Sequence, residues 1–133
     1  MASSGVLSGI GPNRAAGIID EDHLQRMTLG DRRLEREVLE IFVRQIAIML
    51  SRIATAQPAL AAAAAHTLKG SARGIGAWQV ARAAERVECA AASRPNGQAL
   101  ATAVEELKTA AAETSAAIDA RLGHASADTA RDH

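Results

Sequence analysis

The chain has 133 residues, and its 15 lysines and arginines balance 15 aspartates and glutamates, so its formal net charge at neutral pH is zero. This length fits one domain and excludes a large multidomain enzyme. Hydrophobic residues make up 48% of the chain and aromatic residues only 2%, a composition that favours closely packed helices over sheets. Because there is no basic excess and no basic stretch with interleaved aromatics, we do not expect nucleic-acid binding.

Cys89 is the only cysteine, which excludes an intrachain disulfide or a multi-cysteine zinc site and favours a cytoplasmic setting. We expect Cys89 itself to be a small buried apolar residue. The chain start lacks the basic segment and apolar run of a signal peptide, and no segment is apolar enough to span a bilayer. The sequence therefore predicts a protein that is not exported and has no membrane partner.

The first predicted helix is short and follows a leader without periodicity. Residues 1–18 are rich in glycine and serine, and we expect them to be flexible. Asp20 then has the features of a helix N-cap, with acidic residues in the turn that follows it. Ile19 can pack on Leu24 across this cap. The pattern predicts a helix that ends at about Thr28.

The second predicted helix is the most apolar element. It begins at about Leu34, after the break at Gly30 and Asp31, and its hydrophobic residues recur at three- and four-residue spacing. They form two stripes, which indicates burial on more than one side. The first stripe comprises Val38, Ile41, Phe42, Ile46, Met49 and Ile53, and the second comprises Leu39, Val43 and Leu50.

Three further helices are predicted over residues 58–75, 78–92 and about 100–122, with a turn at residues 94–97. We expect Gly74 and Gly76 to end the first of them and Gly123 to end the last, with Trp78 covering the end of the bundle. Short connections between long helices predict an all-α fold, an antiparallel four-helix bundle with a short N-terminal capping helix. The bundle would span residues 19–122, and residues 123–133 would form a disordered tail.

His66 lies in the middle of the third predicted helix. At roughly 100° per residue, its neighbours within about 60° are small or basic. These neighbours include Ala62, Ala63, Lys69, Gly70 and Arg73. The large apolar residues Leu60, Leu68 and Ile75 fall on the opposite side, which the bundle core must take. We therefore expect His66 and Lys69 to be exposed.

An exposed histidine is usually an ordinary surface residue, but the neighbours of His66 favour a function. Gly70 in a helix interior costs about 1 kcal/mol relative to alanine, and close approach by a partner is the usual reason for such a glycine. Reversible attachment of a phosphoryl group requires a nucleophile, a nearby cation and open space for the partner. The imidazole, the lysine one turn away and the glycine beside it match these requirements.

Residues 66–77 read HTLKGSARGIGA. This segment resembles the phosphorylation helix of histidine-containing phosphotransfer (Hpt) domains, H-x-x-K-G-[SA]-[SA]-x-x-[LIV]-G, and a weaker resemblance extends over about residues 19–120. It implies a stand-alone phosphorelay protein that carries a phosphoryl group on His66 to or from the aspartate of a response-regulator receiver domain. A hybrid histidine kinase is a further implied partner.

The resemblance also assigns roles around His66. Lys69 and Arg73 would offset the charge of the phosphoryl oxygens, and Gly70 would leave room for the receiver. The receiver would supply Mg²⁺, so the chain needs no cofactor of its own and has no autonomous kinase or ATPase activity. Many members place a Gln or Glu from the following helix near the histidine, and Glu85 and Glu88 are the candidates.

The surface around His66 is the expected docking site for the partner. Its residues would be Ala62, Ala63 and Arg73 on the third helix, with Met27 and Leu29 from the short first helix.

Three alternatives remain open at this stage. The chain could be a phosphotransfer fragment of a histidine kinase, although kinase dimerisation helices carry H-E-x-[KR]-x-P and here Thr67 follows the histidine. It could be a non-catalytic helical adaptor in which His66 does nothing. Metal binding is disfavoured, because the histidines at 23, 66, 124 and 133 lack ligand spacing.

Overall fold

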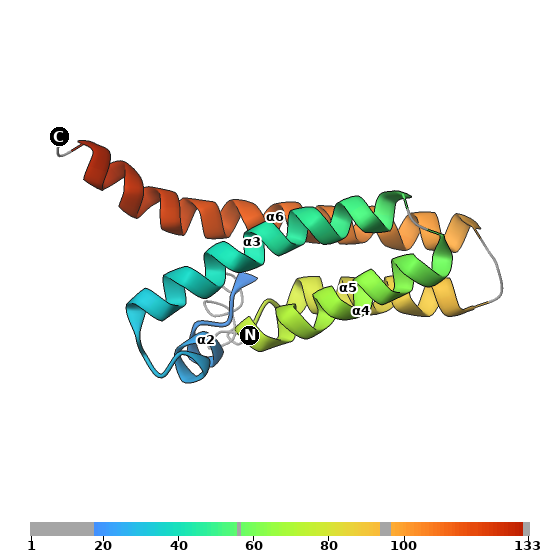
Figure 1. Ribbon diagram of the computed structural model, residues 1–133, viewed down its shortest axis with the longest axis horizontal. Helices are drawn as coiled ribbons and strands as arrows, with labels where there is room; N and C mark the ends of the chain where they lie inside the picture. Colours follow the sequence, from blue (N-terminus) through green and yellow to red (C-terminus); the bar gives the residue numbers. More distant parts are fainter. Residues whose placement is uncertain (1–17, 56, 94–96, 132–133) are drawn as a thin grey trace, which may run out of the picture.

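The computed structural model describes residues 18–55, 57–93 and 97–131, and within these ranges the chain consists of helices joined by short connections. In chain order they are α2 (Glu21–Met27), α3 (Arg32–Thr55), α4 (Pro58–Ile75), α5 (Trp78–Ala92) and α6 (Gly97–Arg131). The four long helices lie antiparallel, and α2 packs beside α4 at one end of the bundle (Figure 1). The predicted all-α bundle with an N-terminal capping helix is confirmed.

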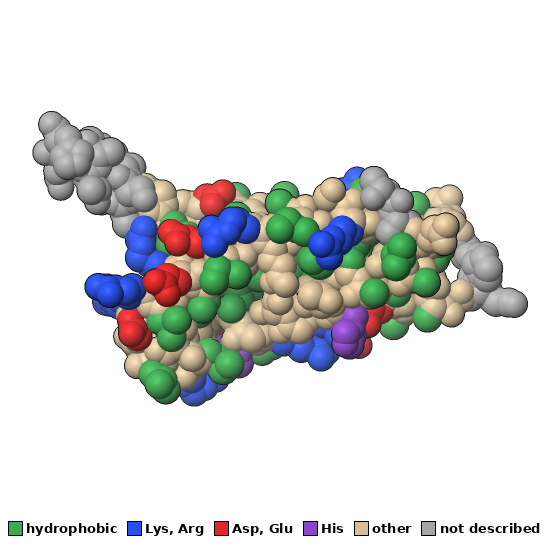
Figure 2. Space-filling view, viewed as in Figure 1, with side chains coloured by type: hydrophobic (Ala, Val, Ile, Leu, Met, Phe, Trp, Pro, Cys, Tyr) green, Lys and Arg blue, Asp and Glu red, His purple; other side chains and the backbone are tan. Residues whose placement is uncertain are grey.

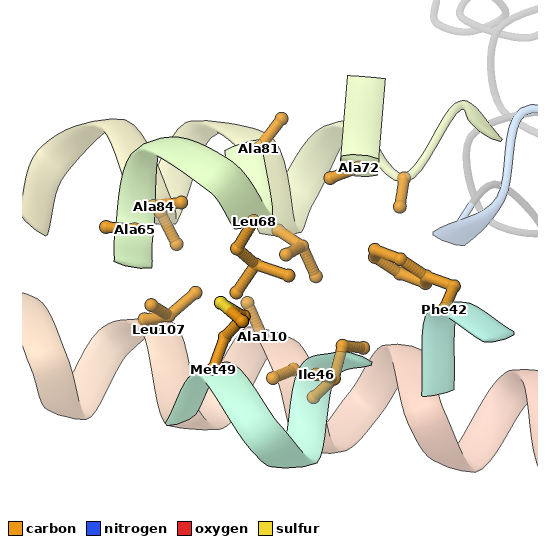
Figure 3. Packing of buried hydrophobic residues seen from close by; sticks show 14 of the residues in the cluster. Phe42, Ile46, Met49, Ala65, Leu68, Ala72, Ala81, Ala84, Leu107 and Ala110 are labelled. Atoms are coloured by element: carbon orange, nitrogen blue, oxygen red, sulfur yellow. The ribbon is translucent and has the colours of Figure 1, made fainter. Parts of the chain in front are cut away.

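Small residues on α4 and α5 bring these two helices close together. Ala65 and Ala72 of α4, and Ala81 and Ala84 of α5, are all buried. The larger side chains of the core come mainly from the other helices, and Met49 and Phe42 of α3 point toward the α4–α5 pair in Figure 3. Packing alanine against alanine allows backbones to approach, so side chains at the edges of α4 and α5 can reach one another.

Asp20 joins the capping helix to the bundle. Its carboxylate accepts hydrogen bonds from the backbone N–H of His23 at 3.1 Å and from the Trp78 indole at 2.9 Å. Its own N–H donates to the carbonyl of Gly76 at 2.9 Å. Gly76 has φ +84°, and a Cβ at this position would lie 2.9 Å from Asp20 Cβ, so only glycine fits the joint. The predicted N-cap, helix end and position of Trp78 are therefore confirmed.

The predicted end of α4 at about Ile75 is confirmed, with Gly76 as the cap and Gly74 inside the helix, but the end predicted for the last helix was wrong. The last helix does not stop near Leu122 and Gly123, because α6 continues to Arg131 through most of the expected disordered tail. Gly123 is not in the left-handed region that would end a helix. An interior glycine costs only about 1 kcal/mol, and no proline follows to terminate the helix.

Two core assignments were also wrong. Leu60, expected in the core, is 63% exposed. It lies in the first turn of α4, at the edge of the apolar arc. At this end of the bundle the neighbouring helices leave its side chain largely uncovered. Cys89, expected to be buried, is exposed. It follows the buried Val87 by two residues, which turns it about 200° away from the core.

The apolar helix α3 buries most of its first stripe, from Phe42 to Ile53, and Leu39 of its second. Ile41, however, is 54% exposed and Ile48, seven residues further on, is 50% exposed. A spacing of seven residues keeps the two side chains on one face of the helix. The α3 surface therefore carries an apolar strip that the bundle does not cover.

Some sequence predictions fall outside the described ranges. They concern the flexible leader up to residue 17 and the turn residues 94–96, whereas Gly97 begins α6. Within the described ranges, no helix is long and apolar enough to cross a bilayer.

We predict that Asp20→Ala lowers the free energy of unfolding by about 1–2 kcal/mol at neutral pH, because it removes a helix cap and a bond to Trp78. Hydrogen bonds from Trp78 and His23 hold the pKa of Asp20 below its ordinary value. Its contribution should therefore be complete above about pH 4 and disappear as the pH falls through the lowered pKa.

Urea denaturation followed by Trp78 fluorescence measures this difference at several pH values. Asp22→Ala is the matched control, since Asp22 is exposed in the same first turn and should contribute only through the helix dipole. Equal losses in the two variants would show that the Asp20 joint does not stabilise the fold.

Candidate functional site

His66 stands on the outer face of α4, and its side chain is 70% exposed. The confirmed helical phase places it opposite Leu68, which is completely buried. Gly70, one turn onward, is exposed, and nothing lies within 4 Å of the position that its Cβ would take. The imidazole is therefore held on a rigid helix beside an open surface.

Glu88 of α5 contacts this histidine. Its Oε2 lies 2.7 Å from Nδ1 of His66, a hydrogen-bonding distance, and the glutamate side chain is 22% exposed. Glu85, the other candidate, lies three residues earlier on α5, and its Oε1 is 3.8 Å from Nη2 of Arg73. Figure 2 shows a histidine beside acidic side chains along the edge of α4. The structure thus selects Glu88 as the carboxylate at the histidine.

Lys69 is also held by Glu88. Its Nζ lies 2.6 Å from Oε1, and only 14% of its side chain is exposed. The prediction that Lys69 is exposed was therefore wrong. Lys69 lies about 60° from His66 around the helix, toward α5, where its aliphatic stem packs between the two helices and its ammonium meets the carboxylate.

The charge of Glu88 fixes the form of the imidazole. Partial burial raises the pKa of Glu88, but the contacts from Lys69 and His66 outweigh burial and place that pKa below its ordinary value. At neutral pH the group is therefore a carboxylate, which can only accept hydrogen bonds. The hydrogen must then lie on Nδ1 of His66, and Nε2 keeps its lone pair as the nucleophilic atom.

The other predicted site residues lie on α4 or at the end of α2 and just after it. Arg73 is exposed, as is Ala63, whereas Ala62 is half-buried. From the capping-helix region, Met27 is 56% and Leu29 is 90% exposed. Their accessibility agrees with the predicted docking surface, while their roles remain predictions.

A helical wheel could have distinguished the two glutamates. Glu88 follows the buried Ala84 by four residues and therefore lies at the edge of the buried arc of α5, where a charge needs a partner. Glu85 lies further around the helix and is more exposed. Among the described residues, no group of three or more His, Cys, Asp or Glu side chains could hold a metal ion.

Comparisons with known proteins identify the family to which the chain is similar. The Hpt domain family matches residues 37–117, more than half of the chain and a range that includes His66. The solved structure of the histidine phosphotransferase ShpA from Caulobacter crescentus is 27% identical in sequence, with a TM-score of 0.66. The match covers 85% of this chain and 98% of that one. No curated protein sequence matches the chain significantly.

We predict that at pH 8 the neutral imidazole of His66 carries its hydrogen on Nδ1, because the Glu88 carboxylate accepts that hydrogen. Long-range ¹H–¹⁵N NMR spectra, which distinguish the two ring nitrogens, measure this tautomer. In Glu88→Ala the preference for Nδ1–H should be lost, whereas Glu85→Ala should leave it unchanged. An Nε2–H tautomer in the wild type would contradict the assignment of the nucleophilic atom.

Proposed function

The chain belongs to the Hpt domain family and is a phosphorelay histidine phosphotransfer protein, and we propose that His66 is the residue that carries its phosphoryl group. The observation that supports this assignment is the exposed imidazole whose Nδ1 is occupied by Glu88. The nitrogen left for attack is Nε2, on a ring open to a partner. Of the four histidines, only His66 precedes a Lys-Gly pair at this spacing.

The phosphoryl donor or acceptor is an aspartate on a receiver domain in this proposal. The receiver would supply Mg²⁺ and the acidic pocket that neutralise the transferring group. This chain would contribute the position of Nε2, the tautomer set by Glu88 and the clearance at Gly70. Arg73 would offset charge at the edge of the docked receiver, since it is exposed and its ion pair with Glu85 is long, at 3.8 Å.

The receiver would dock on the face formed by α2, α3 and α4. Exposed apolar side chains suited to such an interface are Met27, Leu29, Ile41 and Ile48. Hydrophobic side chains gather along the band between α3 and α4 in Figure 2. From His66 to the end of α4, beside α2, the helix rises about 15 Å. A docking area of about 800 Å² per partner can include both.

Leu29 gives this surface additional support. Its φ is +56°, in the left-handed region that favours glycine or asparagine, and its side chain is 90% exposed. A non-glycine residue in this conformation costs about 1 kcal/mol or more. Neither burial nor backbone geometry accounts for a leucine here, whereas contact with a partner does.

We expect His66→Gln to abolish phosphoryl transfer, because the substitution removes the nucleophile while an exposed position leaves the fold intact. The wild type, incubated with Mg²⁺ and a phosphorylated receiver domain, should gain an acid-labile, base-stable label. ATP alone should give no label, since the chain has no nucleotide-binding motif.

His124→Gln serves as the matched control and should label like the wild type. Unchanged labelling of the His66 variant would refute the assignment, and the chain would then fit a non-catalytic adaptor. Self-labelling with ATP would instead indicate a kinase.

We further expect Gly70→Ala to stabilise the fold by up to about 1 kcal/mol, because alanine is the better helix former and open space surrounds the added methyl group. The same variant should weaken receiver docking. Leu29→Asn should likewise leave the fold at least as stable and weaken docking.

Thermal unfolding and titration with an isotope-labelled receiver domain measure the two effects. Gly74→Ala is the control, because a methyl group there also meets open space but lies another turn away from His66. A destabilised Gly70→Ala, or normal docking by both variants, would contradict the proposed surface.

A further inference from the structure

Glu88 binds the two charged groups of the site at the same time. One carboxylate oxygen lies 2.7 Å from Nδ1 of His66 and the other 2.6 Å from Nζ of Lys69. The Lys69 side chain is mostly buried, with 14% of it exposed, whereas the His66 side chain is 70% exposed. Lys69 is thus directed at the carboxylate on α5, away from the open side on which a phosphoryl group would bind.

Transfer of the phosphoryl group from His66 depends on the hydrogen on Nδ1. Nε2 attacks phosphorus as the bond from phosphorus to the receiver's aspartyl oxygen breaks, and the electron pair leaves with the aspartate carboxylate. The hydrogen on Nδ1 stays in place, so the phosphorylated ring is a cation. In the return step, a ring that has kept this proton leaves as neutral imidazole. A ring that has lost it must leave as imidazolate, a far stronger base and therefore a much poorer leaving group.

We propose that Glu88 is a positioning residue that retains the Nδ1 proton on phosphorylated His66, and that Lys69 acts by fixing Glu88. The pair keeps the phosphohistidine able to transfer its phosphoryl group at neutral and mildly alkaline pH. This inference rests on the proposed function and deepens it, since it concerns the release step at the same site. It assigns Lys69 a role different from the direct phosphoryl contact implied by the family resemblance.

The charges around the ring favour this assignment. From α5, Glu88 is in direct contact with the imidazole, and Glu85 is engaged with Arg73 instead. From α4, Lys69 reaches the ring only through Glu88, and Arg73 lies two turns further along the helix. The neighbouring Thr67 hydroxyl donates to the carbonyl of Ala63 and has no charge. Within the described part of the chain, Glu88 is therefore the one charged side chain recorded in contact with the ring.

The sign of the effect follows from electrostatics. The protonated phosphorylated ring is the cationic form, and an adjacent anion favours this form over the neutral one. Glu88→Gln keeps an oxygen that can accept the Nδ1 hydrogen but removes the charge. In this variant the ring should lose its proton at a lower pH, and the transfer rate should begin to fall at that lower pH.

The test uses the full chain phosphorylated with phosphoramidate, a small-molecule phosphoryl donor, and then freed of the donor. ³¹P and ¹⁵N NMR follow the titration of the phosphorylated ring, and rapid mixing with a receiver domain gives the transfer rate at each pH. For Glu88→Gln we expect the midpoint of the ring titration and that of the rate profile both to move down by about one pH unit. At a pH above both midpoints, this shift corresponds to about a tenfold slower transfer. Glu85→Gln, the matched control, should superimpose on the wild type.

A double-mutant cycle tests the role of Lys69. If Lys69 acts through Glu88, Lys69→Ala should slow transfer in the wild-type background and have little effect in Glu88→Gln. If Lys69 instead contacts the phosphoryl oxygens, its loss should slow transfer in both backgrounds, and that part of the proposal would be wrong.

The remaining outcomes are also distinguishable. Circular dichroism and thermal unfolding check that each variant is folded, and Glu88→Asp, which keeps the charge but withdraws the carboxylate, is the second variant. It should shift the midpoints in the same direction as Glu88→Gln. Unchanged midpoints in folded Glu88 variants would overturn the inference. Failure of the wild type to exchange phosphate with any receiver, despite a normal ring titration, would overturn the proposed function instead.

Discussion

The close approach of α4 and α5 is the constraint on which the site depends. Ala65 and Ala72 of α4 are buried, as are Ala81 and Ala84 of α5, and such small residues let the two packed helices approach closely. The glutamate on α5 thereby reaches both a histidine and a lysine on α4. The alanine content that makes the sequence look featureless is thus what brings the charged groups together, and larger core residues on these helices would separate them.

The Glu88 carboxylate stabilises two side chains at once, those of Lys69 and His66. The mostly buried Lys69 side chain needs a partner for its charge, because burying an unpaired charge is costly, and Glu88 provides one. An exposed imidazole populates both tautomers unless one nitrogen is occupied, and the same carboxylate occupies Nδ1. Before phosphorylation the ion pair is neutral overall, so an incoming dianionic group meets no uncompensated negative charge.

Much of this could be predicted from the sequence, because helical periodicity reports which face of a helix is buried. The phase of α4 put Leu68 inside and His66 outside, and both placements are confirmed. Periodicity carries no information about how one helix is rotated and shifted against its neighbour. It therefore placed Lys69 in solvent, whereas the phase of α5, with Glu88 four residues after the buried Ala84, could have favoured Glu88 over Glu85. Cys89 was misjudged for a different reason, because it was placed by residue type although its position two residues after Val87 directs it away from the core.

Several exposed residues depart from the choices that local rules favour. Leu29 adopts a left-handed backbone and Gly70 interrupts a helix of good formers, each at a cost of about 1 kcal/mol. Ile41 and Ile48 expose apolar surface on the neighbouring helix. Natural sequences depart from local consistency mainly where function requires it. These departures weaken the isolated fold, because glycine or asparagine at position 29 and alanine at position 70 would avoid the local cost.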